Sequence, residues 1–232
     1  VLSTAALVAM VSSIATAAFA DTYDLNKGSV EIVAKDGIQS ITQRDDTGAF
    51  VKDEKGENID NRQDDDITLT TKNKDTGETE TAHNTVTITA ETENDTANVT
   101  LQDVHIESSS KWSSDPAPIE IKGNGNTKLE LNGNNTVFSG NEDHAGIEKA
   151  DVNGTGTLTI KDDLNDKGEE KTGTDKDSTL VAGGFENSAA IGGGGTYDTA
   201  CTSNITITGG KITASGSRYG AGIGGGYTGD AS

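Results

Sequence analysis

Two aspartates stand at equivalent places after glycine-rich runs near the end of the chain. Asp198 follows the run at 192–195, and Asp230 follows a similar run 32 residues later. If the two segments stack with the strand spacing of a β-sheet, their carboxylates lie about 5 Å apart. Carboxylates at that distance repel unless a cation joins them, and oxygen ligands on loops suit calcium. The spacing therefore predicts a calcium site at Asp198 and Asp230, with two independent Asx turns as the alternative.

Three aromatic residues are candidates for binding sugar rings. Trp112 is the only tryptophan and stands in the polar segment SSSKWSSDPAP, while Tyr219 and Tyr227 stand in turns near the end of the chain. The C–H faces of sugars pack on aromatic rings like other apolar surfaces, and the polar group of the ring remains free for a hydrogen bond. These three residues are the predicted ligand-binding platform. For Trp112 the alternative is a ring that folds back to cover a thin core.

The acidic residues and histidines form no recognisable catalytic motif in the sequence. Asp162 and Asp163 are adjacent, but their context, LTIKDDLNDKGEE, is typical of a solvated loop, and His83, His105 and His144 share no motif. Glycoside hydrolysis needs two converging carboxylates, and a lyase needs a calcium-binding cluster with a basic residue nearby. We therefore predict a non-catalytic protein. A polysaccharide lyase or glycoside hydrolase, with its site outside these motifs, is the alternative.

The candidate residues are carried by a repeated unit. LVAGGFENSAAIGGGGTYD at 180–198 aligns without a gap with ITASGSRYGAGIGGGYTGD at 212–230. Looser copies have the same order of alternating apolar run, turn, second apolar run and polar loop. Four units begin near Val99, Leu129, Leu158 and Ile205, and VTITA at 86–90 is a trace of a fifth. A polar insert at about 161–178 interrupts the third unit.

Short alternating runs of this kind predict strands that are not stable as isolated hairpins. Stacked copy on copy, each strand pairs with its equivalent about 4.8 Å away, and glycines form the corners. The pattern predicts an all-β fold, a right-handed parallel β-helix (a solenoid with three faces per coil) that lacks its C-terminal coils. A β-sandwich is the alternative. We expect an acidic lead-in or cap region at 21–85 and the β-helix domain at 86–232.

Composition and charge exclude some partners. The chain has 38 acidic and 18 basic residues, for a net charge of −20, and only 31% of its residues are hydrophobic. Nucleic acid and anionic lipid are bound through basic patches, so neither is an expected partner. The low apolar content suits a thin core.

The first twenty residues predict export from the cell. VLSTAALVAMVSSIATAAFA is uncharged and ends in Ala18-Phe19-Ala20, which is typical of a secretory signal peptide cleaved after Ala20. A membrane anchor is the alternative. We expect a secreted or cell-surface protein with no stable membrane insertion after cleavage. Cys201 is the only cysteine, and we expect it to be a small buried thiol.

Two stretches resemble known bacterial surface proteins. The strand, turn, second strand and GAGIGGG at 205–226, found in part at 180–194, resemble the coils of surface β-helix proteins secreted by clostridia-like gut bacteria. The segment at 86–160, with LQDVHIESS and IEIKGNGNTKLELNGNNTVFSG, is similar to the carbohydrate-binding β-helix domain of clostridial cellulose- and pectin-binding proteins. The resemblance implies binding of extracellular polysaccharide, often with calcium in the coil loops. It implies no particular ligand residues.

The functional hypothesis is therefore a secreted or cell-surface, non-catalytic adhesin that binds polysaccharide through repeated polar groups on a rigid face. Threonines that alternate in TGTLTI at 155–160 and ITIT at 205–208 raise a further alternative, an ice-binding solenoid. The plainer interpretation of these threonines is an exposed sheet face.

Overall fold

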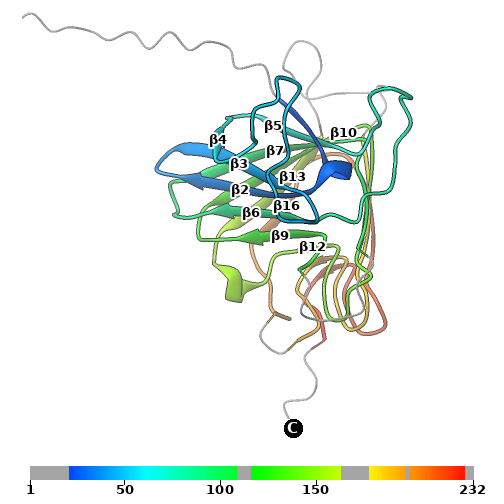
Figure 1. Cartoon of the computed structure of the whole chain (residues 1–232). Helices are drawn as coiled ribbons and strands as arrows, with labels where there is room; N and C mark the ends of the chain where they lie inside the picture. The colour runs from blue at the N-terminus through cyan, green and yellow to red at the C-terminus, as the bar shows by residue number, and fades with distance from the viewer. Residues whose placement is uncertain (1–20, 109–115, 163–177, 197–198, 228–232) are drawn as a thin grey trace, which may run out of the picture.

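The computed structural model describes residues 21–108, 116–162, 178–196 and 199–227 (Figure 1). The described chain is all-β, with strands β1 to β18 and two short 3-10 helices, η1 (Leu25–Lys27) and η2 (Asp151–Asn153). The predicted signal peptide, Trp112, Asp163, Asp198 and Asp230 lie outside the described residues.

The strands form three sheets. Sheet 1 contains β1 (Thr22–Asp24), β5 (Ile67–Thr70), β7 (Thr96–Gln102), β10 (Asn126–Asn132), β13 (Thr157–Asp162) and β16 (Ile205–Ile207) in that order. Sheet 2 contains β8 (His105–Glu107), β11 (Asn134–Phe138), β14 (Thr179–Gly183) and β17 (Lys211–Ser215). Sheet 3 contains, from one edge to the other, β18 (Ile223–Gly224), β15 (Ile191–Gly192), β12 (Ile147–Glu148), β9 (Ile119–Lys122), β6 (Val86–Ala90), β2 (Ser29–Lys35), β3 (Ile38–Arg44) and β4 (Arg62–Gln63).

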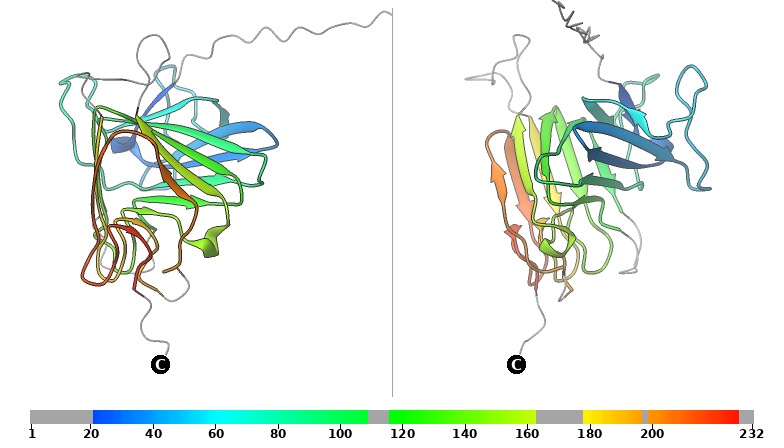
Figure 2. Two further views of the ribbon diagram at one scale, coloured as in Figure 1. Left: turned by 180° about the vertical axis from the view of Figure 1, so that it is seen from behind. Right: turned by 90° about the vertical axis from the view of Figure 1, so that its left-hand side faces the viewer.

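The chain visits the three sheets in a fixed cycle. From β7 to β18 it passes from sheet 1 to sheet 2 to sheet 3 four times, and each pass adds one strand to every sheet. Every pairing among these strands is parallel. The right-hand view of Figure 2 shows the passes following one another from the N-terminal, blue end to the C-terminal, red end. We call each pass through the three sheets a coil.

The predicted stacking of the four repeat units in one parallel sheet is confirmed. In sheet 1, Leu129 lies opposite Val99, and Leu158 lies opposite Ile205. The partner of Leu129 in β13 is Ile160, so the third unit is shifted by two residues from the sequence alignment. In the last two coils, the aligned pairs of the sequence repeat are also pairs in the sheets, as Leu180 with Ile212 and Ile191 with Ile223.

Parallel stacking begins well before residue 86. Strands β1 and β5 lie in sheet 1, and β2 pairs in parallel with β6 in sheet 3. Only β3 and β4 are antiparallel to their neighbours among the described pairs, and they form the N-terminal edge of sheet 3. The region at 21–85 therefore contributes strands to two of the sheets in addition to leading into the repeats.

The acidic residues after β3 build tight turns. One carboxylate oxygen of Asp45 accepts hydrogen bonds from the backbone N–H groups of Thr47 and Ala49, and Asp53 does the same for Lys55 and Glu57. The Thr47 hydroxyl, which also donates to Asp45, and these backbone N–H groups hold the pKa of Asp45 below its usual range, and the N–H of Glu57 is the main cause of the lowered pKa of Asp53. Asx turns of this kind reverse the chain without a long loop.

The core between the sheets consists of aliphatic side chains. Alternate residues of the longer strands point inward, as Val99, Leu101, Leu129, Leu131, Leu158 and Ile160 do in sheet 1, and all six are buried. Among the described residues, Tyr23 is the only aromatic residue in this core. A core with a single aromatic ring fits the narrow space between sheets of short strands.

Glycines form the corners between sheet 3 and sheet 1. Gly154 adopts a φ of +132°, and a β-carbon placed on it would lie 2.0 Å from the carbonyl oxygen of Gly123 in the preceding coil. Gly156 would meet the carbonyl oxygen of Gly125 at the same distance. Stacked backbones at these corners leave no room for a side chain, so glycine is required there.

The polar insert leaves the sheets in register. β13 ends at Asp162 and β14 begins at Thr179, and β14 still pairs in parallel with β11. The backbone N–H of Ser178 donates to the Asp162 carboxylate at 3.2 Å, so the two ends of the insert lie side by side. No helix among the described residues is long and apolar enough to cross a membrane.

Candidate functional site

Tyr219 and Tyr227 form an exposed aromatic pair on the last coil. Tyr219 lies in the connection between β17 and β18, and Tyr227 lies three residues after β18. Their ring centroids are 4.8 Å apart with a tilt of 35°, and the residues are 53% and 40% exposed. Two of the three aromatic residues predicted to bind a ligand are thus brought together by the fold.

The backbone around the pair is fixed by the preceding coil. The N–H of Tyr227 donates to the carbonyl of Asn187 at 2.6 Å. A β-carbon on Gly220 would lie 1.8 Å from the carbonyl oxygen of Ser188, and one on Gly226 would lie 1.8 Å from that of Gly194. These close approaches explain why glycines flank both tyrosines.

Arg218 adds a cationic group to the tyrosine pair. Its guanidinium carbon lies 5.2 Å from the centre of the Tyr219 ring, within the range of a cation–π contact. Arg218 is exposed, so its N–H groups remain accessible to a ligand. The arrangement offers an apolar ring surface beside hydrogen-bond donors.

Two further exposed rings lie on the same side of the neighbouring coils. Phe138 is the last residue of β11, and Phe185 follows β14 by two residues, so both lie where the chain turns from sheet 2 to sheet 3. They are 36% and 41% exposed. The sequence analysis missed them, although each such connection of the last four coils has one aromatic residue in or beside it, Trp112 among them. That regular placement was the signal available in the sequence.

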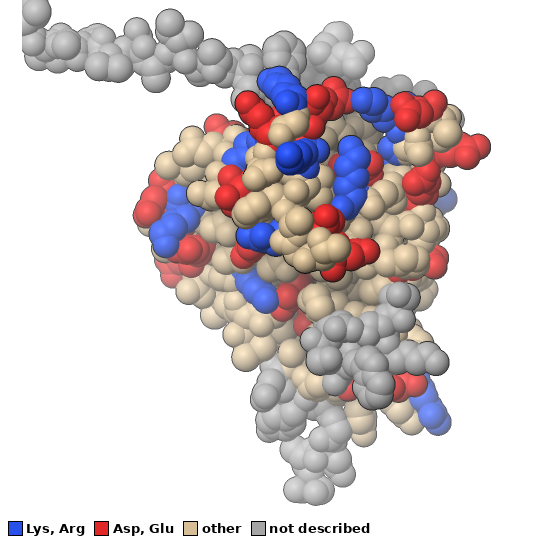
Figure 3. Space-filling view, in the orientation of Figure 1, with Lys and Arg blue, Asp and Glu red and all other residues tan. Residues whose placement is uncertain are grey.

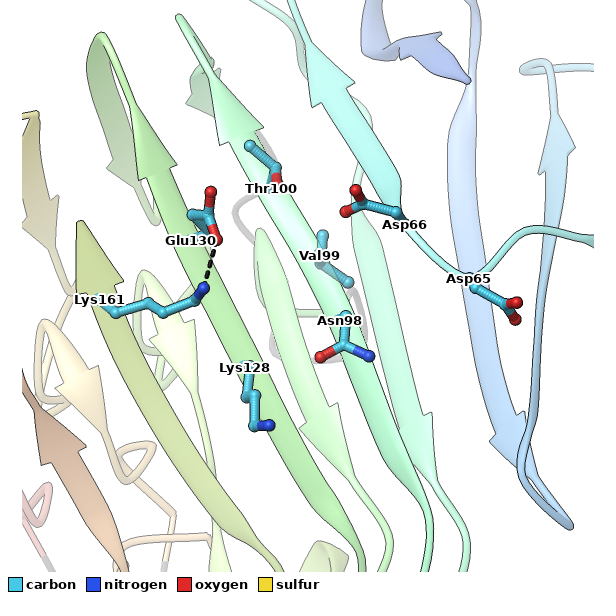
Figure 4. Close-up of a pocket in the computed structure, with 8 residues that line it drawn as sticks. All are labelled: Asp65, Asp66, Asn98, Val99, Thr100, Lys128, Glu130 and Lys161. Atoms are coloured by element: carbon cyan, nitrogen blue, oxygen red, sulfur yellow. Dashed lines mark ion pairs between the residues drawn. The ribbon is translucent and has the colours of Figure 1, made fainter. Parts of the chain in front are cut away.

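A second candidate surface is a groove of about 330 Å³ on the outer face of sheet 1 (Figure 4). Its lining comes from β7, β10, β13 and the segment that leads into β5: Asp65, Asp66, Asn98, Val99, Thr100, Lys128, Glu130 and Lys161. The groove was also missed by sequence reasoning, because it depends on which residues of distant strands lie in register.

Register places the side chains of the groove in rows across the sheet. Glu130 lies between Thr100 and Lys161, and Lys128 lies beside Asn98. Glu130 and Lys161 form an ion pair, drawn as the dashed line in Figure 4. Figure 4 shows the Asp66 carboxylate directed over β7, whereas Asp65 points away from the other lining residues. The groove therefore offers hydroxyl, amide and charged groups that suit a ligand rich in hydroxyls.

Two of the histidines lie beside Glu107, and the third lies elsewhere. In sheet 2, the His105 ring lies 3.0 Å from the Glu107 carboxylate, and His83 contacts the Glu107 carbonyl oxygen at 2.6 Å. His144 is on the sheet 2 to sheet 3 connection, where its Nδ1 lies 3.0 Å from the buried carboxylate of Glu148. Within the described ranges, no group of three or more His, Cys, Asp or Glu residues is arranged to hold a metal ion.

Cys201 corrects one expectation. It is exposed and free, whereas the sequence analysis expected a buried thiol. The residue lies in the connection from β15 to β16, and its carbonyl oxygen accepts from the N–H of Asp151 in the coil before. The backbone is therefore held by the stack while the side chain lies outside the core.

Charge on the visible face of the molecule is mixed. In Figure 3, the basic side chains lie among acidic ones, so the described residues on this face form no continuous basic patch. This distribution agrees with the net charge of −20. It gives this face no electrostatic attraction for a polyanion.

Comparison with known proteins yields no match to this chain: no family model, no curated protein and no solved structure is similar to it.

Proposed function

We propose that this protein is a secreted or cell-surface, non-catalytic protein that binds extracellular polysaccharide, in the manner of an adhesin. The observation that carries the proposal is the exposed pair of Tyr219 and Tyr227, whose ring centroids lie 4.8 Å apart beside Arg218. Exposed paired rings suit the C–H faces of sugars, and the guanidinium suits their oxygens. A family relationship to the clostridial carbohydrate-binding proteins belongs to this proposal.

We propose a right-handed parallel β-helix as the architecture that presents these groups. Support comes from the repeated order of sheet 1, sheet 2 and sheet 3, and from the parallel pairing between coils. Crossover connections between parallel strands of one sheet are right-handed in about 98% of cases. Such a scaffold holds one face of each coil in line with the next and so favours multivalent binding.

We propose calcium as a ligand of the last two coils. Gly192 pairs with Gly224 in sheet 3, so the glycine runs that precede Asp198 and Asp230 are stacked. If the two aspartates share a calcium ion, EGTA lowers the unfolding temperature of the wild-type protein. In the Asp198→Asn/Asp230→Asn variant EGTA then has no effect. An unfolding temperature that is the same with calcium and with EGTA in the wild type would refute the site.

A glycoside hydrolase is the second candidate function, and the groove on sheet 1 is the observation that favours it. Asp66 and Glu130 both line the groove, on either side of strand β7. Two carboxylates across a sugar-sized groove are the minimum for glycoside hydrolysis. The ice-binding alternative has less support, because Lys128 and Glu130 stand between the threonines of β7 and those of β13.

Retention on insoluble polysaccharide tests the proposal. The mature protein is incubated with cellulose, chitin, starch and cross-linked pectin, and the bound fraction and the sugars released are both measured. Binding without released reducing sugar or unsaturated product supports the proposed function. Sugar release that Glu130→Gln abolishes would favour the hydrolase, and absence of retention on every polymer would contradict binding.

A further inference from the structure

The described aromatic residues are placed for a role outside the core. Four of the six, Phe138, Phe185, Tyr219 and Tyr227, are exposed, and only Tyr23 is buried in the core. Aromatic side chains stabilise a protein most when buried, because they remove a large apolar area from water. Because this chain builds its core from aliphatic residues and exposes four rings on one side, we assign those rings a role other than stabilising the core.

The exposed rings follow one another along the stack. Phe138 lies opposite Gly183, and Gly183 lies opposite Ser215, so these three residues mark the same point in three successive coils. Phe185 lies two residues beyond this point and Tyr219 four residues beyond it. The rings of successive coils, each about 4.8 Å further along the axis, therefore form an oblique line.

Contacts between coils hold the line of rings in place. A β-carbon on Gly183 would lie 2.3 Å from Cδ1 of Phe138, so the Phe138 ring covers this glycine and leans toward the next coil. The buried Ser188 hydroxyl lies 2.6 Å from the carbonyl oxygen of Phe185 and 2.7 Å from that of His144. The N–H of Phe185 also donates to His144. A surface fixed in this way loses little conformational entropy when a ligand binds.

Polar side chains separate the rings and indicate what binds them. Glu186 follows Phe185 and is exposed, and Asn187 donates to Asp143 at 3.1 Å between the two coils. Arg218 adjoins Tyr219. Rings that alternate with carboxylates and amides fit a ligand whose apolar faces alternate with hydroxyl groups, whereas a protein interface has a continuous apolar centre. Carboxylates accept hydrogen bonds from sugar hydroxyls and repel acidic sugars.

From this arrangement we infer that the glycan site continues from the tyrosine pair across Phe185 to Phe138, and that its ligand is one neutral, unbranched polysaccharide chain lying obliquely along the stack. The inference rests on the proposed function and adds the class and the direction of the ligand. A disaccharide covers only the tyrosine pair, while a longer chain also contacts the two phenylalanines. Affinity therefore rises with chain length.

Calorimetric titration with cello-, chito- and malto-oligosaccharides, from disaccharide to hexasaccharide, tests the inference. In the oligosaccharide series that binds, Phe185→Ala and Phe138→Leu each weaken hexasaccharide binding by about threefold to tenfold. This is the change in affinity expected when one aromatic contact is lost. Neither changes binding of the disaccharide. Phe50→Ala is the matched control, because Phe50 is a partly exposed ring in the turn after β3, packed on Arg44.

The outcomes separate this inference from the proposed function. If Phe185→Ala and Phe138→Leu bind the hexasaccharide like the wild type while Tyr219→Ala loses binding, the glycan site does not extend to the two phenylalanines. The proposed function then still stands. Oligogalacturonides that bind as tightly as the neutral series contradict the assigned class. If the wild type binds none of these oligosaccharides or their polymers, both proposals fail. Unfolding temperatures are measured for every variant, and Phe185→Ala decides if Phe138→Leu does not fold.

Discussion

Asp64 is a buried carboxyl group next to the only aromatic residue that the structure places in the core. The Tyr23 hydroxyl donates to Asp64 Oδ2 at 2.9 Å, and the N–H of Asp66 donates to Oδ1 at 3.1 Å. Burial raises the pKa of Asp64, although both hydrogen bonds oppose the shift. Burial and the neighbouring Asp64 raise the pKa of Tyr23 as well.

The raised pKa of Asp64 makes folding stability depend on pH. The folded state holds this proton more tightly than the unfolded state, so the stabilisation is complete below the unfolded pKa of about 3.9 and is lost as pH rises through the folded pKa. Asparagine has no charge; its Oδ1 still accepts from the N–H of Asp66, and its Nδ2 donates to the Tyr23 hydroxyl oxygen in place of the hydrogen bond that Tyr23 donates to Asp64. We expect the unfolding temperature of Asp64→Asn, relative to wild type, to increase between acidic and neutral pH. A difference that stays constant or decreases would contradict the assignment.

Residue identity alone did not reveal every functional candidate. The sequence analysis selected Tyr219 and Tyr227 because aromatic residues are conspicuous in glycine-rich turns, and the fold pairs them. Phe138 and Phe185 were missed although the sequence places one aromatic residue in or beside each sheet 2 to sheet 3 connection of these coils; the pairing of β11 with β14 then shows that the two rings share a side. Cys201 was assigned to the interior on the general tendency of cysteine, which does not apply to a connection outside the strands.

At the scale of the element, the corner glycines differ in how closely the neighbouring coil approaches them. Gly154 and Gly224 have nearly the same φ, +132° and +133°, but differ in what a β-carbon would meet. At Gly154 it would lie 2.0 Å from a backbone oxygen of the preceding coil, while at Gly224 the nearest atom is 3.5 Å away. The two positions separate the cost of the backbone conformation from the cost of the contact between coils.

Alanine at these two glycines is expected to have unequal effects. Gly224→Ala carries only the cost of a φ of +133°, a backbone conformation that residues other than glycine rarely adopt, about 1 to 3 kcal/mol. Gly154→Ala carries that cost and must also push two coils apart, so its loss of stability is larger. Urea unfolding of both variants measures the difference. Equal losses would mean that the coils are not packed backbone to backbone at this corner.

Removal of the insert tests the independence of the coils. Because Asp162 and Ser178 are hydrogen-bonded, a short Gly-Ser linker can replace 163–177 without moving β13 or β14. Loop-closure entropy changes by only about 0.6 kcal/mol for each halving of loop length. We expect unchanged circular dichroism and an unfolding temperature equal to or slightly above that of wild type. Loss of folding would show that the insert is part of the core.

The repeats were predictable from sequence to the extent that they are regular. Alternation of apolar residues and the shared order of the repeat units identified the strands at Val99, Leu129, Leu158 and Ile205, because these signals reflect inward-facing positions. The earlier strands β1 and β5 were not recognised. The antiparallel β3 and β4, and the turns built by Asp45 and Asp53, separate them and remove the regular spacing.

At the scale of the whole molecule, the three sheets place different chemistry on different sides. The outer face of sheet 1 carries the polar groove, and the connections from sheet 2 to sheet 3 carry three exposed rings, with Tyr227 beside the last of them. The chain as a whole has a net charge of −20. The account therefore predicts a rigid scaffold that binds a neutral glycan through its aromatic side and has no electrostatic attraction for nucleic acid or anionic polymers.

Affinity electrophoresis of a tyrosine double variant tests this account most directly. Wild type, Tyr219→Ala/Tyr227→Ala and the control Phe50→Ala are run in native gels with and without soluble neutral polysaccharide, such as hydroxyethylcellulose, glycol chitin or soluble starch. The account predicts that at least one of these polymers retards the wild type and Phe50→Ala, while the double variant, with an unchanged unfolding temperature, migrates as it does in the polymer-free gel. Equal retardation of all three proteins, or no retardation of the wild type by any polymer, would contradict it.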